Sequence, residues 1–128
     1  MTTDRTIDPM RTILLVDDHA GFRRRARELL EGSAFTVVGE ASDGPSALAE
    51  AAALRPQVVL LDIGLPGDDG FAVARELHVR RDAPSVVLTS SRPSSAYGPR
   101  LAETLAVGFL RKDELTASAV AKLVDGPR

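Results

Sequence analysis

The sequence contains no cysteine. This absence excludes disulfide frameworks, thiolate zinc sites and cysteine nucleophiles, and it is typical of proteins in a reducing cytosol. No apolar run reaches the roughly 20 residues that a membrane-spanning helix needs, and the polar start has no signal-peptide core. We therefore expect a cytoplasmic protein that does not span a membrane.

A basic surface for nucleic acid is also lacking. The net charge is −2, aromatic residues make up only 4% of the chain, and no basic stripe with interleaved aromatic residues is present. Arg23, Arg24, Arg25 and Arg27 do cluster, but their spacing predicts the solvent face of a helix. Direct binding of nucleic acid is therefore not expected.

Length and composition predict a single globular domain. A chain of 128 residues has the size of one domain. Its apolar share of 44% and charged share of 27% allow a core without disulfides or a structural metal. We expect a flexible tail over residues 1–10, a domain over residues 11–125, a short tail over residues 126–128, and no output domain.

Short apolar segments alternate with segments of helical spacing. The predicted strands are residues 12–16, 35–39, 58–61, 85–88 and 107–110. Continuous apolar runs of this length are typical of strands buried on both faces of a parallel sheet. The alternation predicts an α/β fold, with a five-stranded parallel sheet and helices on both of its faces. The order of the strands does not follow from this pattern.

Capping and breaking residues place the predicted helices. Gly32 is positioned to end the first helix, Asp43 to cap the second, and Asp113 to cap the last. Proline is favoured in the first turn of a helix and costs about 3 kcal/mol inside one, so Pro99 predicts a short fourth helix over residues 99–105. The side chains predicted to face inward are Phe22, Ala26, Leu29 and Leu30, then Phe71, Ala74 and Leu77, then Leu101 and Leu105, and finally Leu115, Ala119 and Leu123.

Polar residues follow four of the predicted strands. They are Asp17 and Asp18 after the first, Asp62 after the third, Thr89 after the fourth and Lys112 after the fifth. Ligands of open parallel sheets bind beyond these strand ends. Adjacent carboxylates repel by about 4 kcal/mol per pair at ~4 Å and an effective dielectric near 20, and an oxygen-ligated Mg²⁺ relieves this repulsion. Asp62 is then predicted to attack phosphorus and form an acyl phosphate, while Lys112 and Thr89 stabilise the transferring oxygens.

Four features carry a family resemblance: the Asp17-Asp18 pair, the segment LLDIGLP over residues 60–66, Thr89 after VVL, and Lys112 after GFLR. Together they resemble the receiver domain of bacterial two-component response regulators, over about residues 12–124. The VDDH and RKD segments are similar to the subfamily whose receivers usually precede a helix-turn-helix domain. The resemblance implies a flavodoxin-like sheet of order 2-1-3-4-5. Asp113 departs from it, since many members have proline there.

The resemblance implies a role for each matching residue. Asp62 is the implied phosphoacceptor. Asp18 is implied to be a direct Mg²⁺ ligand, Asp17 a mostly water-mediated ligand, and the backbone carbonyl of Gly64 a further ligand. Thr89 is the implied switch hydroxyl, Lys112 the implied phosphate partner, and Phe109 the aromatic residue that would move inward on activation. Position 64 commonly holds a larger residue in the family, so Gly64 leaves water a more open approach to the phosphoryl group. We interpret His19 as a helix-entry residue and not a ligand. For Phe109, an ordinary core role is the open alternative.

The implied function is that of a phosphoacceptor signalling module with Mg²⁺ as its cofactor. A sensor histidine kinase or a phosphotransfer protein would supply the phosphoryl group. The fourth helix, fifth strand and last helix would form the surface for an unidentified downstream target or, after phosphorylation, a second copy. The only catalysis expected is the chain's own phosphotransfer and autodephosphorylation. Two alternatives stay open: a Mg²⁺-dependent aspartyl phosphatase, disfavoured because no cap domain selects a substrate, and a receiver-like module that binds partners without phosphorylation.

Overall fold

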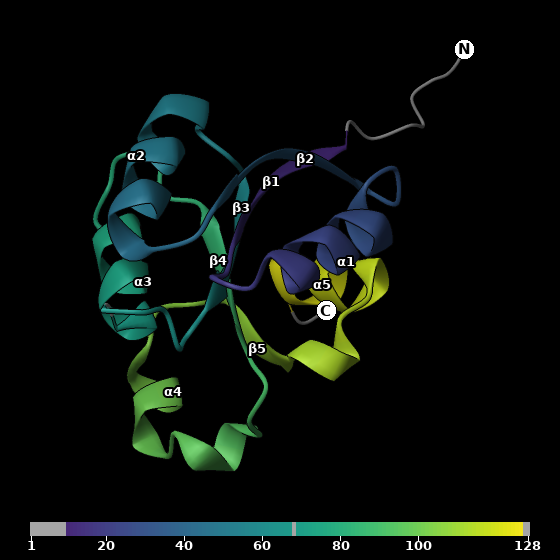
Figure 1. The fold of residues 1–128 in the computed structure, drawn as a ribbon. Coiled ribbons are helices and arrows are strands. Elements are labelled where there is room, and N and C mark those ends of the chain that lie inside the picture. The colour runs from purple at the N-terminus through teal and green to yellow at the C-terminus, as the bar shows by residue number, and fades with distance from the viewer. Residues whose placement is uncertain (1–9, 68, 127–128) are drawn as a thin grey trace.

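A single parallel sheet forms the centre of the molecule (Figure 1). The structure, a computed structural model, describes residues 10–67 and 69–126; of the predicted tails, residues 1–9 and 127–128 lie outside this range. The strands are β1 (Arg11–Val16), β2 (Phe35–Ala41), β3 (Val58–Asp62), β4 (Ser85–Ser90) and β5 (Gly108–Arg111). They pair in parallel in the order β2-β1-β3-β4-β5. This confirms the predicted fold class and the implied flavodoxin-like order.

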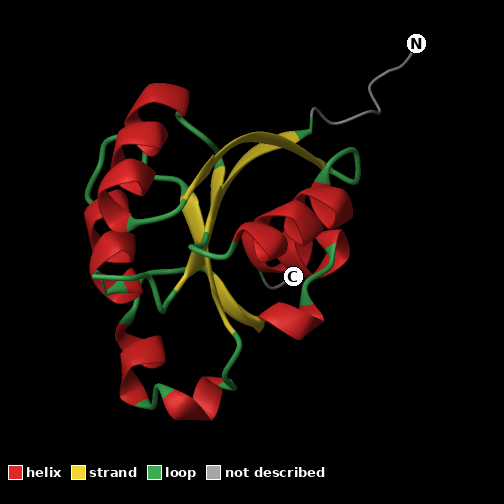
Figure 2. Cartoon of the chain, viewed as in Figure 1, coloured by secondary structure: helices red, strands yellow, loops and turns green. Residues whose placement is uncertain are grey.

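Helices cover both faces of this sheet (Figure 2). On one face lie α1 (Ala20–Leu30) and α5 (Ala117–Asp125), and on the other α2 (Gly44–Leu54) and α3 (Gly70–His78), with the short α4 (Pro99–Glu103) next to α3. Each face has its own apolar core. No helix within the described ranges is both long and apolar enough to cross a membrane.

The position of β3 in the middle of the sheet explains why residues 58–61 are all apolar. All of β3 is buried, and its side chains alternate between the two cores. Val58 and Leu60 belong to the core under α1 and α5, whereas Val59 and Leu61 belong to the core under α2 and α3. A strand covered on both faces needs apolar residues at every position. The strand therefore delivers its last residue, Asp62, to the edge of the sheet from a rigid support.

The start of the last helix corrects one prediction. α5 is capped by Thr116, whose Oγ1 accepts a hydrogen bond from the Ala119 N–H at 3.0 Å. The predicted cap, Asp113, lies instead within a 3₁₀ turn over Lys112–Glu114. Leu115 is buried in the core before the helix begins. Because this apolar residue has to reach the core first, the helix starts later than the acidic residue indicated.

The strand boundaries differ from prediction by at most two residues. β2 extends to Ala41, two residues beyond the predicted end, and β5 is shifted by one residue from the predicted range 107–110. The helix α2 begins where predicted, because Asp43 Oδ1 accepts a hydrogen bond from the Ser46 N–H at 2.8 Å. Local capping chemistry therefore determines this boundary.

The fourth helix begins at proline as predicted but ends early. α4 spans Pro99–Glu103, and Thr104 then adopts an extended backbone conformation. Leu105 is 62% exposed, so its predicted place on the apolar face of α4 is wrong. Leu101 and Ala106 contact the core instead. With no fully buried residue, α4 is the most weakly anchored of the five α-helices described.

Candidate functional site

The carboxyl ends of four strands bring the predicted site residues to one edge of the sheet (Figure 1). Asp17 directly follows β1, Asp62 ends β3 and Lys112 follows β5. Thr89 of β4 pairs in register with Asp62. Asp17, Asp62 and Thr89 are buried, and the Lys112 side chain is 17% exposed. Segments far apart in the sequence thus converge at the place that the strand-end analysis predicted.

An acidic cluster occupies this edge. Asp17, Asp18, His19 and Asp62 each offer one ligand atom, and these four atoms lie within 4.8 Å of one another. Asp18 is partly exposed, which leaves the cluster open to solvent. Hard carboxylate oxygens with an open side fit Mg²⁺, which keeps several of its waters. The donor set therefore matches the predicted ion.

Asp62 lies in an environment that resists its ionisation. Burial, and then the negative charge of Asp17, raise the pKa of the Asp62 carboxyl above its usual value. A hydrogen bond from the Gly64 N–H to Oδ1 at 3.1 Å and the Lys112 ammonium, 3.6 Å from Oδ2, act in the opposite direction. A buried carboxylate beside other carboxylates is the environment in which a cation is most stabilising.

Lys112 is shared between two carboxylates. Its Nζ lies 2.6 Å from Asp17 Oδ2, an ion pair outside hydrogen-bond geometry, and 3.6 Å from Asp62 Oδ2. The ammonium also lies 4.7 Å from the centroid of the Phe22 ring, which restricts its position. Asp17 Oδ1 in turn accepts a hydrogen bond from the His19 N–H at 2.8 Å. One cation thus faces two buried anions, and a second cation would complete the charge balance.

Thr89 carries a buried hydroxyl that is hydrogen-bonded to none of the described residues. The residue is 1% exposed, and its Oγ1 makes no hydrogen bond to any part of the chain that the structure describes. Leaving a buried polar group unsatisfied costs about 1–3 kcal/mol. Such a group next to Asp62 is suited to donate to an oxygen of a bound or transferred group.

Three further predicted residues occupy distinct places. Among the described residues, a Cβ added at Gly64 would have only Asp62 Oδ1 within 4 Å, at 3.9 Å, so the approach from this side is open. His19 precedes α1 as its N-cap, which confirms its helix-entry position, and its Nδ1 lies 3.1 Å from carboxylate oxygens of both Asp17 and Asp18. Phe109 is half-buried and packs on Tyr97 with ring centroids 6.1 Å apart. Its switch role stays a prediction.

One contact to the site was not predicted from the sequence. The arginine cluster is not entirely a solvent face: Arg24 and Arg25 are exposed, but Arg23 and Arg27 are half-buried and both pair with Glu40 of β2. Arg23 Nη1 also donates a hydrogen bond to the backbone carbonyl of Asp17 at 2.6 Å. The four-residue spacing of the two arginines was the available signal, because it places both on one side of α1.

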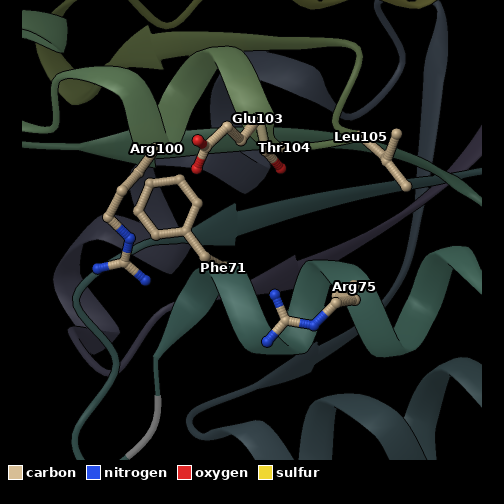
Figure 3. A pocket seen from close by; sticks show the side chains of 6 residues that line it. All are labelled: Phe71, Arg75, Arg100, Glu103, Thr104 and Leu105. Carbon is tan, nitrogen blue, oxygen red and sulfur yellow. The ribbon is translucent and has the colours of Figure 1, made fainter.

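A hollow between α3 and α4 lies outside this site (Figure 3). Its lining residues are Phe71, Arg75, Arg100, Glu103, Thr104 and Leu105. The Arg100 guanidinium lies 4.3 Å from the Phe71 ring centroid and pairs with Asp69. The hollow shares no lining residue with the acidic cluster. It therefore belongs to the surface formed by α3 and α4.

An open parallel sheet of this order, with three aspartates, a buried hydroxyl and a lysine at its carboxyl edge, defines the class of phosphoacceptor receivers. Comparison with known proteins agrees: the sequence profile of the family described as "Response regulator receiver domain" matches residues 13–124. The chain belongs to this family.

Two relatives and one solved structure illustrate the similarity. The chain is 43% identical, over 80% of its length, to a protein-glutamate methylesterase/protein-glutamine glutaminase 6 from Anaeromyxobacter dehalogenans, of which it covers 29%. It is 37% identical, over 70% of its length, to the transcriptional regulatory protein PdtaR from Mycobacterium tuberculosis, of which it covers 43%. The signal receiver domain of NarL from Mycobacterium tuberculosis superposes with a TM-score of 0.84 at 32% identity, with 94% of this chain and 100% of that chain covered.

The relatives are longer than this chain. It spans about half or less of the length of the curated relatives that it matches. The shared part is the receiver domain, so the regulatory and enzymatic names of those proteins describe the relatives as wholes.

Proposed function

We propose that this chain receives a phosphoryl group on Asp62, from a sensor histidine kinase or a phosphotransfer protein, in a Mg²⁺-dependent reaction in the cytoplasm. One observation carries the proposal: a buried Asp62 lies beside the Lys112 ammonium and in register with Thr89, whose hydroxyl has no partner within the described residues. We take residues 11–125 as the domain that performs this function.

The acidic cluster would hold the metal. Asp18 and Asp62 would be direct ligands, Asp17 a mostly water-mediated one, and the backbone carbonyl of Gly64 would complete the protein's share. When bound, Mg²⁺ would neutralise negative charge on the cluster and on the incoming phosphoryl oxygens. His19 lies close enough to contact these carboxylates, but the oxygen set suits a hard ion without it.

The chain's own residues would then carry out the transfer. An oxygen of Asp62 forms a bond to phosphorus while the phosphorus–nitrogen bond of a phosphohistidine donor breaks, and the electron pair leaves with the imidazole nitrogen. Lys112 neutralises charge on the transferring oxygens, and Thr89 donates a hydrogen bond to one of them. Gly64 leaves the product open to water, which favours a short phosphoryl lifetime. No other catalysis is proposed.

The signal would leave through the surface of α4, β5 and α5. Tyr97 packs between Phe71 and Phe109, and its hydroxyl contacts Ser90, the residue after Thr89. Movement of Thr89 toward a phosphoryl oxygen would therefore be passed to Tyr97 and to the weakly anchored α4. The occupant of the output surface would be a downstream protein or a second phosphorylated copy.

Phosphorylation by acetyl phosphate tests the proposal. With Mg²⁺, the intact mass should rise by one phosphoryl group, and Asp62→Asn should abolish the rise. Asp82→Asn, at a largely exposed aspartate, is the matched control and should be labelled like the wild type. Labelling of Asp62→Asn at the wild-type level would contradict the assignment, and sustained turnover of p-nitrophenyl phosphate would favour the phosphatase alternative.

A further inference from the structure

Both backbone hydrogen-bonding groups of Asp17 are held by other elements. Its N–H donates to the Ala41 carbonyl of β2 at 3.0 Å, and its carbonyl accepts from Arg23 Nη1 of α1 at 2.6 Å. The chain here has just left β1 and carries two carboxylates in succession, Asp17 and Asp18. Fixing the peptide groups on either side of Asp17 fixes the direction in which its Cα–Cβ bond leaves the backbone and limits where the Asp18 backbone can lie.

A shared carboxylate orients the arginine that makes this contact. Arg23 Nε donates to Glu40 Oε1 at 2.8 Å, and the Arg23 side chain is 19% exposed. One turn later, Arg27 donates to Glu40 Oε2 through Nε at 3.0 Å and Nη2 at 2.9 Å. Burial opposes ionisation of Glu40, but the hydrogen bonds from Arg27 and Arg23 outweigh it and lower the pKa of this carboxyl. Glu40 is therefore an anion that holds two guanidinium groups in place.

A helical spacing and a strand register bring these groups together. Arg23 and Arg27 are four residues apart and share one side of α1. Glu40 lies in the part of β2 beyond the predicted strand, where it pairs in register with Leu15 of β1, two residues before Asp17. The longer β2 thus brings an anion next to the loop that leads from β1 to α1.

We propose that Arg23 is a positioning residue for the metal site: it holds the loop between β1 and α1 so that the Asp17 and Asp18 carboxylates converge with Asp62. This inference rests on the proposed function. Arg23 does not touch the carboxylates that would bind the metal; it acts through the Asp17 carbonyl. Groups that orient metal ligands in this way typically change metal affinity by roughly 10–100-fold when removed.

The direction in which Mg²⁺ affinity changes when Arg23 is replaced distinguishes a positioning role from the electrostatic effect of its charge. Arg23 is a cation near a cation site, so deletion of its charge alone should strengthen Mg²⁺ binding. Loss of the carbonyl contact should weaken it, because Asp17 and Asp18 would be less well ordered. A weaker affinity in a variant that has lost a positive charge is therefore the outcome that only a positioning role produces.

Three glutamine variants test this by titration with MgCl₂, followed by the backbone amide shifts of His19 and Gly64. Arg23→Gln should weaken Mg²⁺ binding by roughly tenfold. Arg24→Gln removes the same charge from an exposed neighbour on α1 and should leave binding unchanged or slightly tighter. Arg27→Gln loses the Glu40 contact but not an Asp17 contact, and should fall between the two.

Stability measured without metal shows whether weaker Mg²⁺ binding by the variant is caused only by unfolding. Urea unfolding in EDTA should show Arg23→Gln folded, and saturating Mg²⁺ should restore its phosphorylation by acetyl phosphate. If Arg23→Gln does not fold, Arg23→Lys replaces it, since a single ammonium nitrogen takes the place of the two separate guanidinium nitrogens that contact Glu40 and the Asp17 carbonyl. Weakened Mg²⁺ binding is again expected.

The possible failures are distinguishable. Mg²⁺ affinity of the folded Arg23 variant equal to that of Arg24→Gln, with normal binding in the wild type, overturns the role of Arg23 alone. Absence of Mg²⁺ binding and of phosphorylation in the wild type overturns the proposed function itself.

Discussion

Replacing Asp62 by asparagine should stabilise the metal-free protein. The ligand atoms of Asp17, Asp18 and Asp62 lie within 4.8 Å of one another, so each repulsion is about 3.5 kcal/mol or more at an effective dielectric near 20. Two such repulsions act on Asp62. Lys112, at 3.6 Å, offsets about 4.6 kcal/mol of them. A net of about 2 kcal/mol therefore works against the charged Asp62, before the cost of its burial is added.

The pH dependence has the same origin. Burial first, and then the charge of Asp17, raise the pKa of Asp62 in the folded protein. The folded state therefore binds this proton more tightly than the unfolded state does. The resulting stability is fully present below the unfolded pKa and is lost as the pH rises through the folded pKa. Above the folded pKa the wild type has lost it, whereas Asp62→Asn has no charge to bury.

We expect Asp62→Asn to raise the free energy of unfolding by about 1–3 kcal/mol at pH 7 without metal. Asparagine keeps the shape of the side chain and its acceptor for the Gly64 N–H. Urea unfolding followed by far-ultraviolet circular dichroism, in EDTA, measures the change. With millimolar MgCl₂ the advantage should shrink, because the ion binds and stabilises the folded wild type more than the variant.

Glu76→Gln, which removes an exposed carboxylate from α3, is the control and should change stability by less than about 0.5 kcal/mol. A metal-free Asp62→Asn no more stable than the wild type would refute the repulsion that underlies this reasoning. So would an advantage that is the same at acid pH, where Asp62 is protonated in both states, as at pH 7.

Three further outcomes are expected. Asp18→Ala should weaken Mg²⁺ binding at least roughly tenfold, and more than Asp17→Ala, because it loses a direct ligand; calorimetric titration giving equal affinities would reject this ranking. Lys112→Met should destabilise the metal-free protein by about 3 kcal/mol in urea unfolding, since it leaves buried carboxylates unpaired, while Lys122→Met on exposed α5 surface should not. Beryllofluoride, a phosphoryl mimic, should change amide hydrogen exchange over residues 90–105, and slow exchange there in both states would place the switch elsewhere.

Much of the fold could be predicted because it depends on local chemistry. The run VVLL predicted a strand covered on both faces, and β3 has this environment. The cap at Asp43 and the proline at position 99 predicted where α2 and α4 begin. Strand order was implied by the family resemblance and not by the pattern, because apolar runs do not state which strand pairs with which.

The predicted helix boundaries were wrong where a contact with a distant part of the chain competes with a local sequence pattern. Asp113 has the chemistry of a helix cap, yet burial of Leu115 delays α5 until Thr116 provides the cap. Leu105 has the spacing of the α4 apolar face, yet the chain turns away at Thr104 and leaves it exposed. In both places packing against the rest of the molecule decides between local alternatives of similar energy.

The candidate site divides in the same way. The sequence by itself determined that Asp17, Asp18, Asp62, Thr89 and Lys112 lie at or just beyond the carboxyl ends of strands. Parallel strands end at one edge, so the convergence of these residues was predictable. Only the tertiary structure decided that Lys112 lies closer to Asp17 than to Asp62, that the buried Thr89 hydroxyl has no partner among the described residues, and that Arg23 holds the Asp17 carbonyl. These contacts join residues from different elements, and their distances depend on how helices and strands pack, which no local pattern along the chain specifies.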